Sequence, residues 1–125
     1  MPRKKTEILI VEDDPMQVLM YSIEFEQFNY NVLLARDGKT GLKSIQDLKP
    51  KIVLLDLLLG DMNGTDVLRA LRDSGKIKDI NIIVMTNFTK KGLSDECLEL
   101  GAKAFLVKSE YTPRELVKKI TDEYL

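Results

Sequence analysis

Histidine and tryptophan are both absent from this chain of 125 residues, and only one cysteine, Cys97, is present. Without histidine the protein has no imidazole to act as a general base, as a metal ligand or as a phosphate acceptor. A single cysteine excludes an internal disulfide and is typical of proteins kept in a reducing compartment. We therefore expect a cytoplasmic protein that uses no histidine side chain of its own in its chemistry.

The sequence also lacks the features of membrane and nucleic-acid-binding proteins. No apolar run approaches the roughly 20 residues that a membrane-spanning helix requires. The basic stretch at residues 3–5 precedes an apolar run, residues 8–11, that is too short for a signal peptide, so we interpret the stretch as a solvated tail. The 19 basic and 20 acidic side chains give a net charge of -1, whereas nucleic-acid binders normally carry a basic excess. We expect neither a membrane nor a nucleic acid as a partner.

Length and composition fit one α/β domain. The chain is 44% hydrophobic and 31% charged, and no linker, repeat or low-complexity segment divides it, so we expect residues 1–125 to form a single domain. Five continuously apolar segments, rich in Val, Ile and Leu, alternate with helical patterns; they are residues 8–11, 32–35, 52–55, 80–85 and 104–107. Continuous apolar strands are typical of a parallel sheet that is covered by helices on both faces. The alternation predicts five β-then-α units.

Three of the expected helices have recognisable first residues. Asp37 can cap the helix that follows the second strand, and Asn63, with Asp66 three residues later, can cap the next one. The clearest start is the sequence TPRE, in which Thr112 and Glu115 form a capping box. These positions place helices between the predicted strands.

The helix expected after Pro15 is apolar on two sides. One stripe at helical spacing consists of Val18, Tyr21, Phe25 and Phe28, and a second stripe that widens it consists of Met16, Leu19, Met20 and Ile23. Two interpretations remain open at this point. The helix is either deeply buried or presents a face on which a partner docks.

Polar residues follow four of the five predicted strands directly. They are Glu12 and Asp13 after the first strand, Asp56 after the third, Thr86 after the fourth and Lys108 after the fifth. In a parallel α/β sheet the carboxyl ends of all strands lie along one edge, where ligands bind. We expect these five side chains to meet there.

The residue types at this edge favour phosphate chemistry. Clustered carboxylates repel one another unless a cation lies among them, and Mg²⁺ is the hard cation that takes carboxylate, water and phosphate oxygens. Thr and Lys side chains donate to phosphate oxygens, and an aspartate can become an aspartyl-phosphate. Asp56 is the best candidate acceptor because it is central among the others.

Four segments, ILIVEDDP, IVLLDLLLGDMNG, IIVMTN and AFLVKS, resemble the CheY-like receiver domains of two-component response regulators in order and context. The resemblance covers essentially the whole chain. It implies a flavodoxin-like (βα)5 fold with strand order 2-1-3-4-5. It also implies a stand-alone receiver without an output domain, which promotes its own phosphorylation and dephosphorylation rather than acting as an enzyme on other molecules. The phosphoryl group would come from a histidine kinase or a histidine phosphotransfer protein, and a downstream protein would be the target; a homodimer is left open.

The resemblance also implies roles for the residues around the acceptor. Asp56 looks like the phosphoacceptor, and Asp13 and Asp56 would bind Mg²⁺ together with the backbone carbonyl of Leu58. Glu12 would assist through a bound water. Asp14 has no role in the family pattern, and we expect it to be an exposed acid in the first turn of a helix, where it favours the helix dipole.

Residues on the fourth and fifth strands would bind the phosphoryl group. By the same resemblance, Thr86 and Lys108 would hold its oxygens, helped by the backbone N–H of Asn87. Phe105 takes the position of the switch aromatic that is coupled to Thr86 in the family.

The chain departs from the family pattern at several positions. Ser109 stands where proline usually follows the lysine, so we do not expect the cis peptide common there. Gly60 replaces a stiffening proline, which predicts a looser loop, and Asn87 is bulkier than the usual small residue. Leu58 and Phe88 flank the path of an attacking water in this family, and their apolar side chains predict slow loss of the phosphoryl group.

Two alternatives concern function. A phosphorylation-independent receiver-like interaction module would often lack the acceptor Asp or the Lys, and this chain has both. A small-molecule phosphatase with an aspartyl nucleophile would need a second Asp at Leu58. The segment DGKT imitates a nucleotide-binding loop but lacks the glycine required at Leu33.

Overall fold

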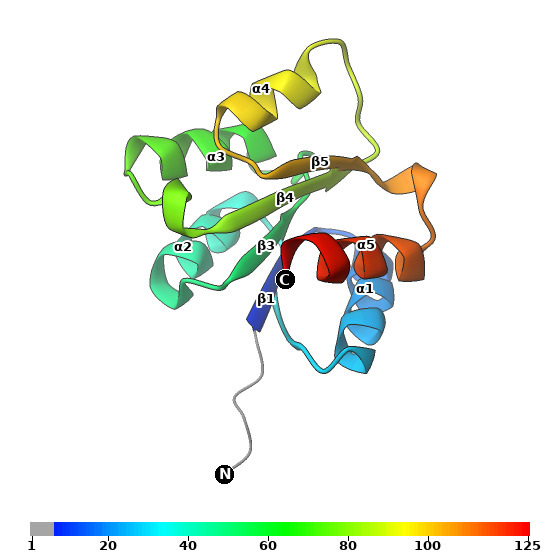
Figure 1. Cartoon of the computed structure of the whole chain (residues 1–125). Coiled ribbons are helices and arrows are strands. Elements are labelled where there is room, and N and C mark those ends of the chain that lie inside the picture. Colours follow the sequence, from blue (N-terminus) through cyan, green and yellow to red (C-terminus); the bar gives the residue numbers. More distant parts are fainter. Residues whose placement is uncertain (1–6) are drawn as a thin grey trace.

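The computed structural model describes residues 7–125 and shows one five-stranded sheet between two layers of helices (Figure 1). The strands are β1 (Glu7–Val11), β2 (Asn31–Ala35), β3 (Ile52–Leu55), β4 (Asn81–Thr86) and β5 (Ala104–Val107). All neighbours are parallel in the order β2-β1-β3-β4-β5, which confirms the predicted fold class and order. Val11 pairs with both Ala35 and Leu55, so these three strands end at the same level. The basic stretch at residues 3–5 lies outside the described residues.

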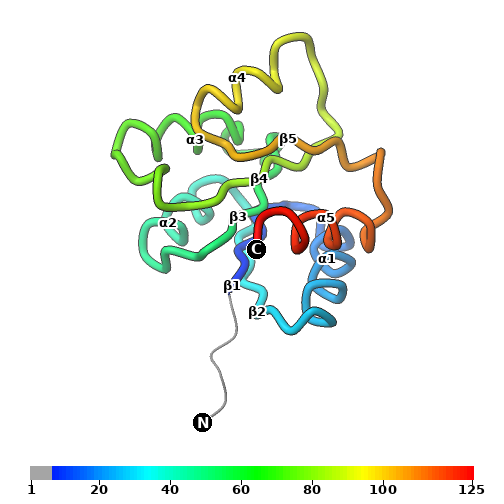
Figure 2. The backbone as a smooth tube through the Cα atoms, viewed as in Figure 1, coloured from blue at the N-terminus to red at the C-terminus, as the bar shows by residue number. Residues whose placement is uncertain are grey.

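The helices divide between the two faces of the sheet. They are α1 (Pro15–Gln27), α2 (Gly38–Leu48), α3 (Gly64–Asp73), α4 (Leu93–Glu99) and α5 (Pro113–Tyr124), with short 3-10 turns η1 (Ile77–Asp79) and η2 (Lys108–Glu110). Helices α1 and α5 cover one face, and α2, α3 and α4 cover the other (Figure 1). The tube in Figure 2 shows β2 at the margin of the sheet beside α1.

Alternate residues of each strand supply two separate hydrophobic cores. Ile8 and Ile10 of β1 pack in the core under α1 and α5, whereas Leu9 and Val11 pack in the core under α2, α3 and α4. Every residue of β3, and every residue after the first in β1 and β4, is therefore buried, which explains why these strands are apolar on both faces rather than alternating. Phe25 of α1 is completely buried, and burial of such a side chain contributes about 2 kcal/mol.

The predicted helix starts are confirmed by hydrogen bonds. The backbone N–H of Thr40 donates to Asp37 Oδ1 over 2.7 Å, and the N–H of Asn63 donates to the Asp66 carboxylate over 3.3 Å. The capping box before α5 is complete. The backbone N–H of Glu115 donates to the Thr112 hydroxyl over 3.1 Å, and the backbone N–H of Thr112 donates to the Glu115 carboxylate over 2.9 Å.

The interpretation of α1 as a deeply buried helix is wrong. Tyr21 and Phe25 are buried, but the outer face of α1 is open to solvent. Exposed fractions are 62% for Met16, 54% for Leu19, 37% for Met20, 46% for Ile23 and 44% for Phe28. We call Met16, Leu19, Met20 and Ile23 the α1 apolar face. Apolar periodicity alone could not show that only one side of the helix meets the sheet.

Within residues 7–125, none of the helices has the length and apolar character needed to cross a membrane.

Candidate phosphoacceptor site

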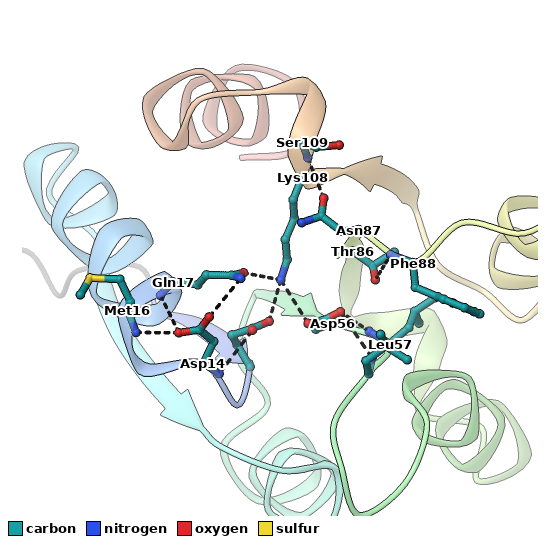
Figure 3. A network of polar contacts seen from close by, with 12 residues as sticks. Asp14, Met16, Gln17, Asp56, Leu57, Thr86, Asn87, Phe88, Lys108 and Ser109 are labelled. Carbon is teal, nitrogen blue, oxygen red and sulfur yellow. Dashed lines mark hydrogen bonds and ion pairs between the residues drawn. The ribbon is translucent and has the colours of Figure 1, made fainter.

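The polar residues at the strand ends converge on one open cleft at the carboxyl edge of the sheet. We call it the strand-end cleft, and it is lined by Glu12, Asp13, Asp14, Gln17, Asp56, Leu58, Thr86, Asn87, Phe88 and Lys108. Figure 3 shows Lys108, Gln17 and Asp56 pointing toward one another from three different elements. The structure therefore brings together all five side chains that the strand ends predicted.

Three carboxylates form an acidic cluster in this cleft. One oxygen each from Glu12, Asp13 and Asp56 lies within 4.8 Å of the others; Glu12 and Asp56 are buried, and Asp13 is exposed. Burial raises the pKa of Glu12 to about 7, and the neighbouring Asp56 adds to this rise. A donor set made only of oxygens suits a hard cation such as Mg²⁺, and a cation there would reduce the repulsion between the clustered carboxylates.

A buried ammonium group lies beside the carboxylates. Lys108 Nζ donates to Glu12 Oε2 over 2.8 Å, to Asp56 Oδ2 over 3.1 Å and to Gln17 Oε1 over 2.5 Å. These three bonds use all three ammonium protons. Burial alone would lower the pKa of Lys108, but the two carboxylates raise it above its usual value, so the side chain is charged at neutral pH.

Asp56 is held on both carboxylate oxygens. Its Oδ1 accepts from the backbone N–H of Leu57 over 2.7 Å, and its Oδ2 accepts from Lys108. Its backbone N–H donates to the carbonyl of Val11 over 3.1 Å, which fixes the residue beside the end of β1. Burial would raise the pKa of Asp56, but the hydrogen bond with Glu12 and the charge of Lys108 lower it below the ordinary value. Asp56 is therefore an ionised, oriented carboxylate, as a nucleophile must be.

Thr86 and Asn87 form the opposite wall. Thr86 is fully buried at the end of β4, and its Oγ1 accepts from the backbone N–H of Phe88 over 3.1 Å. Asn87 is exposed, and its Oδ1 accepts from the backbone N–H of Ser109 over 2.8 Å (Figure 3). The peptide bond between Lys108 and Ser109 is trans, as expected from the absence of proline.

This fold and this set of side chains agree with the sequence comparisons. The sequence model of the response regulator receiver domain matches residues 8–121 of the chain. The chain belongs to the response regulator receiver domain family. Such domains act in signalling, and they are not conventional enzymes.

Individual relatives are similar over most of this receiver. The DNA-binding response regulator MtrA of Mycolicibacterium smegmatis is 36% identical over 121 residues, which is 96% of this chain and 51% of MtrA. The polar-differentiation response regulator DivK of Brucella anthropi is 26% identical over 107 residues, which is 86% of this chain and 87% of DivK. The crystal structure of a CheY-like receiver domain protein from Methanospirillum hungatei has a TM-score of 0.85 at 28% identity, covering 97% of this chain and 94% of that one. The receiver thus spans about half the length of the MtrA relatives that it matches.

Asp14 and Gln17 have contacts that the sequence did not predict. Asp14 is not an exposed first-turn acid but the N-cap of α1, because its carboxylate accepts from the backbone N–H of Met16 over 2.9 Å. The other Asp14 oxygen accepts from Gln17 Nε2 over 3.3 Å, and Gln17 in turn binds Lys108. Gln17 is thus a member of the receiver site that no strand-end pattern could reveal, since it lies 91 residues from its partner.

The loop after the acceptor is tied to α2. Gly60 has a φ of 79°, which only glycine adopts without strain. The next residue is Asp61, whose carboxylate accepts from the backbone N–H of Gly38 over 2.8 Å and from the backbone N–H of Lys39 over 3.0 Å. These hydrogen bonds lower the pKa of Asp61. They anchor the loop in place of the proline whose absence predicted a looser segment.

Phe105 lies outside the strand-end cleft. It is on β5 in register with Val84, half-buried, and packs against the core under α2, α3 and α4. Its role as a switch aromatic remains a prediction.

Proposed function

We propose that this receiver domain takes a phosphoryl group on Asp56 from a histidine kinase or a histidine phosphotransfer protein and signals through protein contacts. The observation that carries the proposal is the Asp56 carboxylate itself. It is buried, kept ionised by Lys108 and held by the backbone N–H of Leu57 beside two further carboxylates.

The proposed transfer forms one bond and breaks one. A carboxylate oxygen of Asp56 attacks phosphorus, a P–O bond forms, and the P–N bond to the donor's imidazole breaks. The electron pair of that bond stays on the imidazole nitrogen, which takes a proton from water. The ammonium of Lys108, the hydroxyl of Thr86 and the backbone N–H of Asn87 would then donate to the phosphoryl oxygens, where negative charge gathers.

The residues fit a bound Mg²⁺ ion. Asp13 and Asp56 would be its carboxylate ligands, the backbone carbonyl of Leu58 would be a third, and Glu12 would act through a bound water. When bound, the ion would neutralise charge between these carboxylates and the incoming phosphoryl group. The exposed position of Asp13 leaves one side of the cluster open to solvent and to a phosphodonor.

We further propose that partners meet the α1 apolar face. Helix α1 begins directly after the acidic cluster, so a protein that docks on Met16, Leu19 and Ile23 would also border the cleft. A phosphotransfer protein or a second copy of this chain would fit such a surface. The setting would be the cytoplasm, with no nucleic acid or membrane as a partner.

Incubation with a small phosphodonor tests the proposal. Intact-mass measurement should show one added phosphoryl group in the presence of Mg²⁺, little after chelation, and none in Asp56→Asn. Asp47→Asn, which changes an exposed carboxylate on α2, is the matched control and should react like the wild type. Equal labelling of Asp56→Asn would overturn the proposal. The same α1 apolar face also supports the alternative of a phosphorylation-independent module, for which Asp56→Asn would bind its partner as well as the wild type under phosphorylating conditions.

A further inference from the structure

The residues that follow Thr86 and Lys108, which are Asn87 and Ser109, are joined by a hydrogen bond. Strands β4 and β5 are in register up to Thr86 and Val107. Beyond that pair the chain leaves β4 for a loop and leaves β5 for the 3-10 turn η2. There Asn87 Oδ1 accepts from the backbone N–H of Ser109 over 2.8 Å (Figure 3). This bond links the two segments at the mouth of the strand-end cleft.

The bond depends on one group from each of two residues, the backbone N–H of Ser109 and the side-chain oxygen of Asn87. A proline at Ser109 would have no N–H to donate. A small residue at Asn87 would have no side-chain oxygen to accept. Each of these two residues therefore supplies a group that the bond requires.

We propose that Asn87 is a positioning residue that sets the distance between the Thr86 hydroxyl and the Lys108 ammonium. This inference rests on the proposed function, because the two groups are those that would hold the phosphoryl oxygens. Lys108 is already held from the other side by Glu12 and Asp56. The hydrogen bond between Asn87 and Ser109 also fixes the segment after Thr86 relative to Lys108. The groups that would donate to a phosphoryl group therefore need less rearrangement when it binds.

The hydrogen bond from Phe88 to Thr86 supports the same role. The N–H of Phe88 donates to Thr86 Oγ1 over 3.1 Å, so the loop folds back on the Thr86 side chain. Asn87 lies between these two residues and is fixed at its own side chain by Ser109. Its backbone N–H therefore belongs to a segment that is tied on both sides. An exposed asparagine without such a link would leave this N–H to be ordered by the ligand.

The test uses variants that differ in one hydrogen-bonding group. Asn87→Ala removes the acceptor and Ser109→Pro removes the donor. Ser109→Ala keeps the backbone N–H and is the matched control, and Asn87→Asp keeps an acceptor. The probe is beryllofluoride, a phosphoryl mimic, and its binding to the protein in the presence of Mg²⁺ is measured by calorimetry. The second readout is hydrogen exchange of the Ser109 amide in the protein without any ligand.

We expect Asn87→Ala and Ser109→Pro each to weaken beryllofluoride binding about fivefold, the factor that one such hydrogen bond is worth, and the double variant to lose no more than either single one. Ser109→Ala should bind like the wild type. Exchange of the Ser109 amide should be about fivefold faster in Asn87→Ala and unchanged in Asn87→Asp.

Each contrary outcome overturns a defined claim. Unchanged affinity in Asn87→Ala, or losses that add in the double variant, would overturn the positioning role while leaving the proposed function in place. Equal loss in Ser109→Ala and Ser109→Pro would show that the serine side chain is responsible, which also overturns it. A wild-type protein that fails to bind beryllofluoride with Mg²⁺ would overturn the proposed function and this inference with it.

Discussion

Replacement of Lys108 by methionine tests the electrostatic balance of the cleft. The substitution keeps the unbranched shape and most of the length of the side chain, and it removes a buried charge that donates to Glu12, Asp56 and Gln17. Two buried carboxylates would then face each other without a cation. Removing one partner of a buried ion pair typically costs about 3 to 5 kcal/mol. Because protonation of Glu12 can relieve part of this repulsion, we expect a loss near the lower end, about 3 kcal/mol in the free energy of unfolding.

The assay is urea unfolding followed by circular dichroism, with a chelator and again with Mg²⁺. A bound cation would replace the missing ammonium charge, so Mg²⁺ should recover a larger part of the stability in Lys108→Met than it adds to the wild type. Lys43→Met, which removes a lysine from an exposed ion pair with Asp47 on α2, is the control and should change stability by no more than about 0.5 kcal/mol. A Lys108→Met protein as stable as this control in the presence of chelator would refute the reasoning.

Three further predictions follow from the same contacts. Asp13→Ala should lose most of the Mg²⁺ affinity measured by calorimetry, and Asp14→Ala should lose little of it. Asp14→Ala should instead lower the free energy of unfolding by about 1 kcal/mol, because it removes the N-cap of α1. Equal losses of metal affinity in the two variants would contradict the assignment of Asp13 as the metal ligand. Because the pKa of Asp61 is lower in the folded protein, its contribution to stability is complete above the unfolded pKa of about 3.9 and is lost as pH falls through the lower folded value. Asp61→Asn should therefore have a lower urea midpoint than the wild type at neutral pH. A difference between the two midpoints that does not narrow in acid would contradict this. Loss of the phosphoryl group should be faster in the double variant Leu58→Asn/Phe88→Glu than in the wild type, because both side chains line the cleft and their polar replacements can orient an attacking water; equal decay in excess Mg²⁺ would show that these residues do not control water.

The α/β fold class and the five strand-end residues could be predicted because they follow from short-range patterns, whereas the strand order came from the resemblance to receivers. Each strand contains an apolar run that a polar residue follows, and parallel pairing brings those ends to one edge. The helix starts at Asp37 and Thr112 are likewise local, since each cap bonds a residue three positions away. For such features the sequence and the resemblance to receivers agree.

The contacts that organise the site around those residues could not be predicted in this way. The bond from Lys108 to Gln17, the link between Asn87 and Ser109 and the anchoring of α2 by Asp61 all join residues that are at least 22 positions apart. They depend on how loops approach one another and leave no periodic signal. Asp61, for example, accepts from the first backbone N–H groups of α2, and nothing in the local sequence marks it as a cap for another helix.

The position of the phosphoryl group is the most direct test of the central claim. After reaction with a small phosphodonor and Mg²⁺, borohydride reduces an aspartyl-phosphate to homoserine, which peptide mass spectrometry locates. We predict homoserine at residue 56 in the wild type and in Asp61→Asn, little of it after chelation, and none in Asp56→Asn. Homoserine at another carboxylate, or at residue 56 to the same extent without Mg²⁺, would contradict the account.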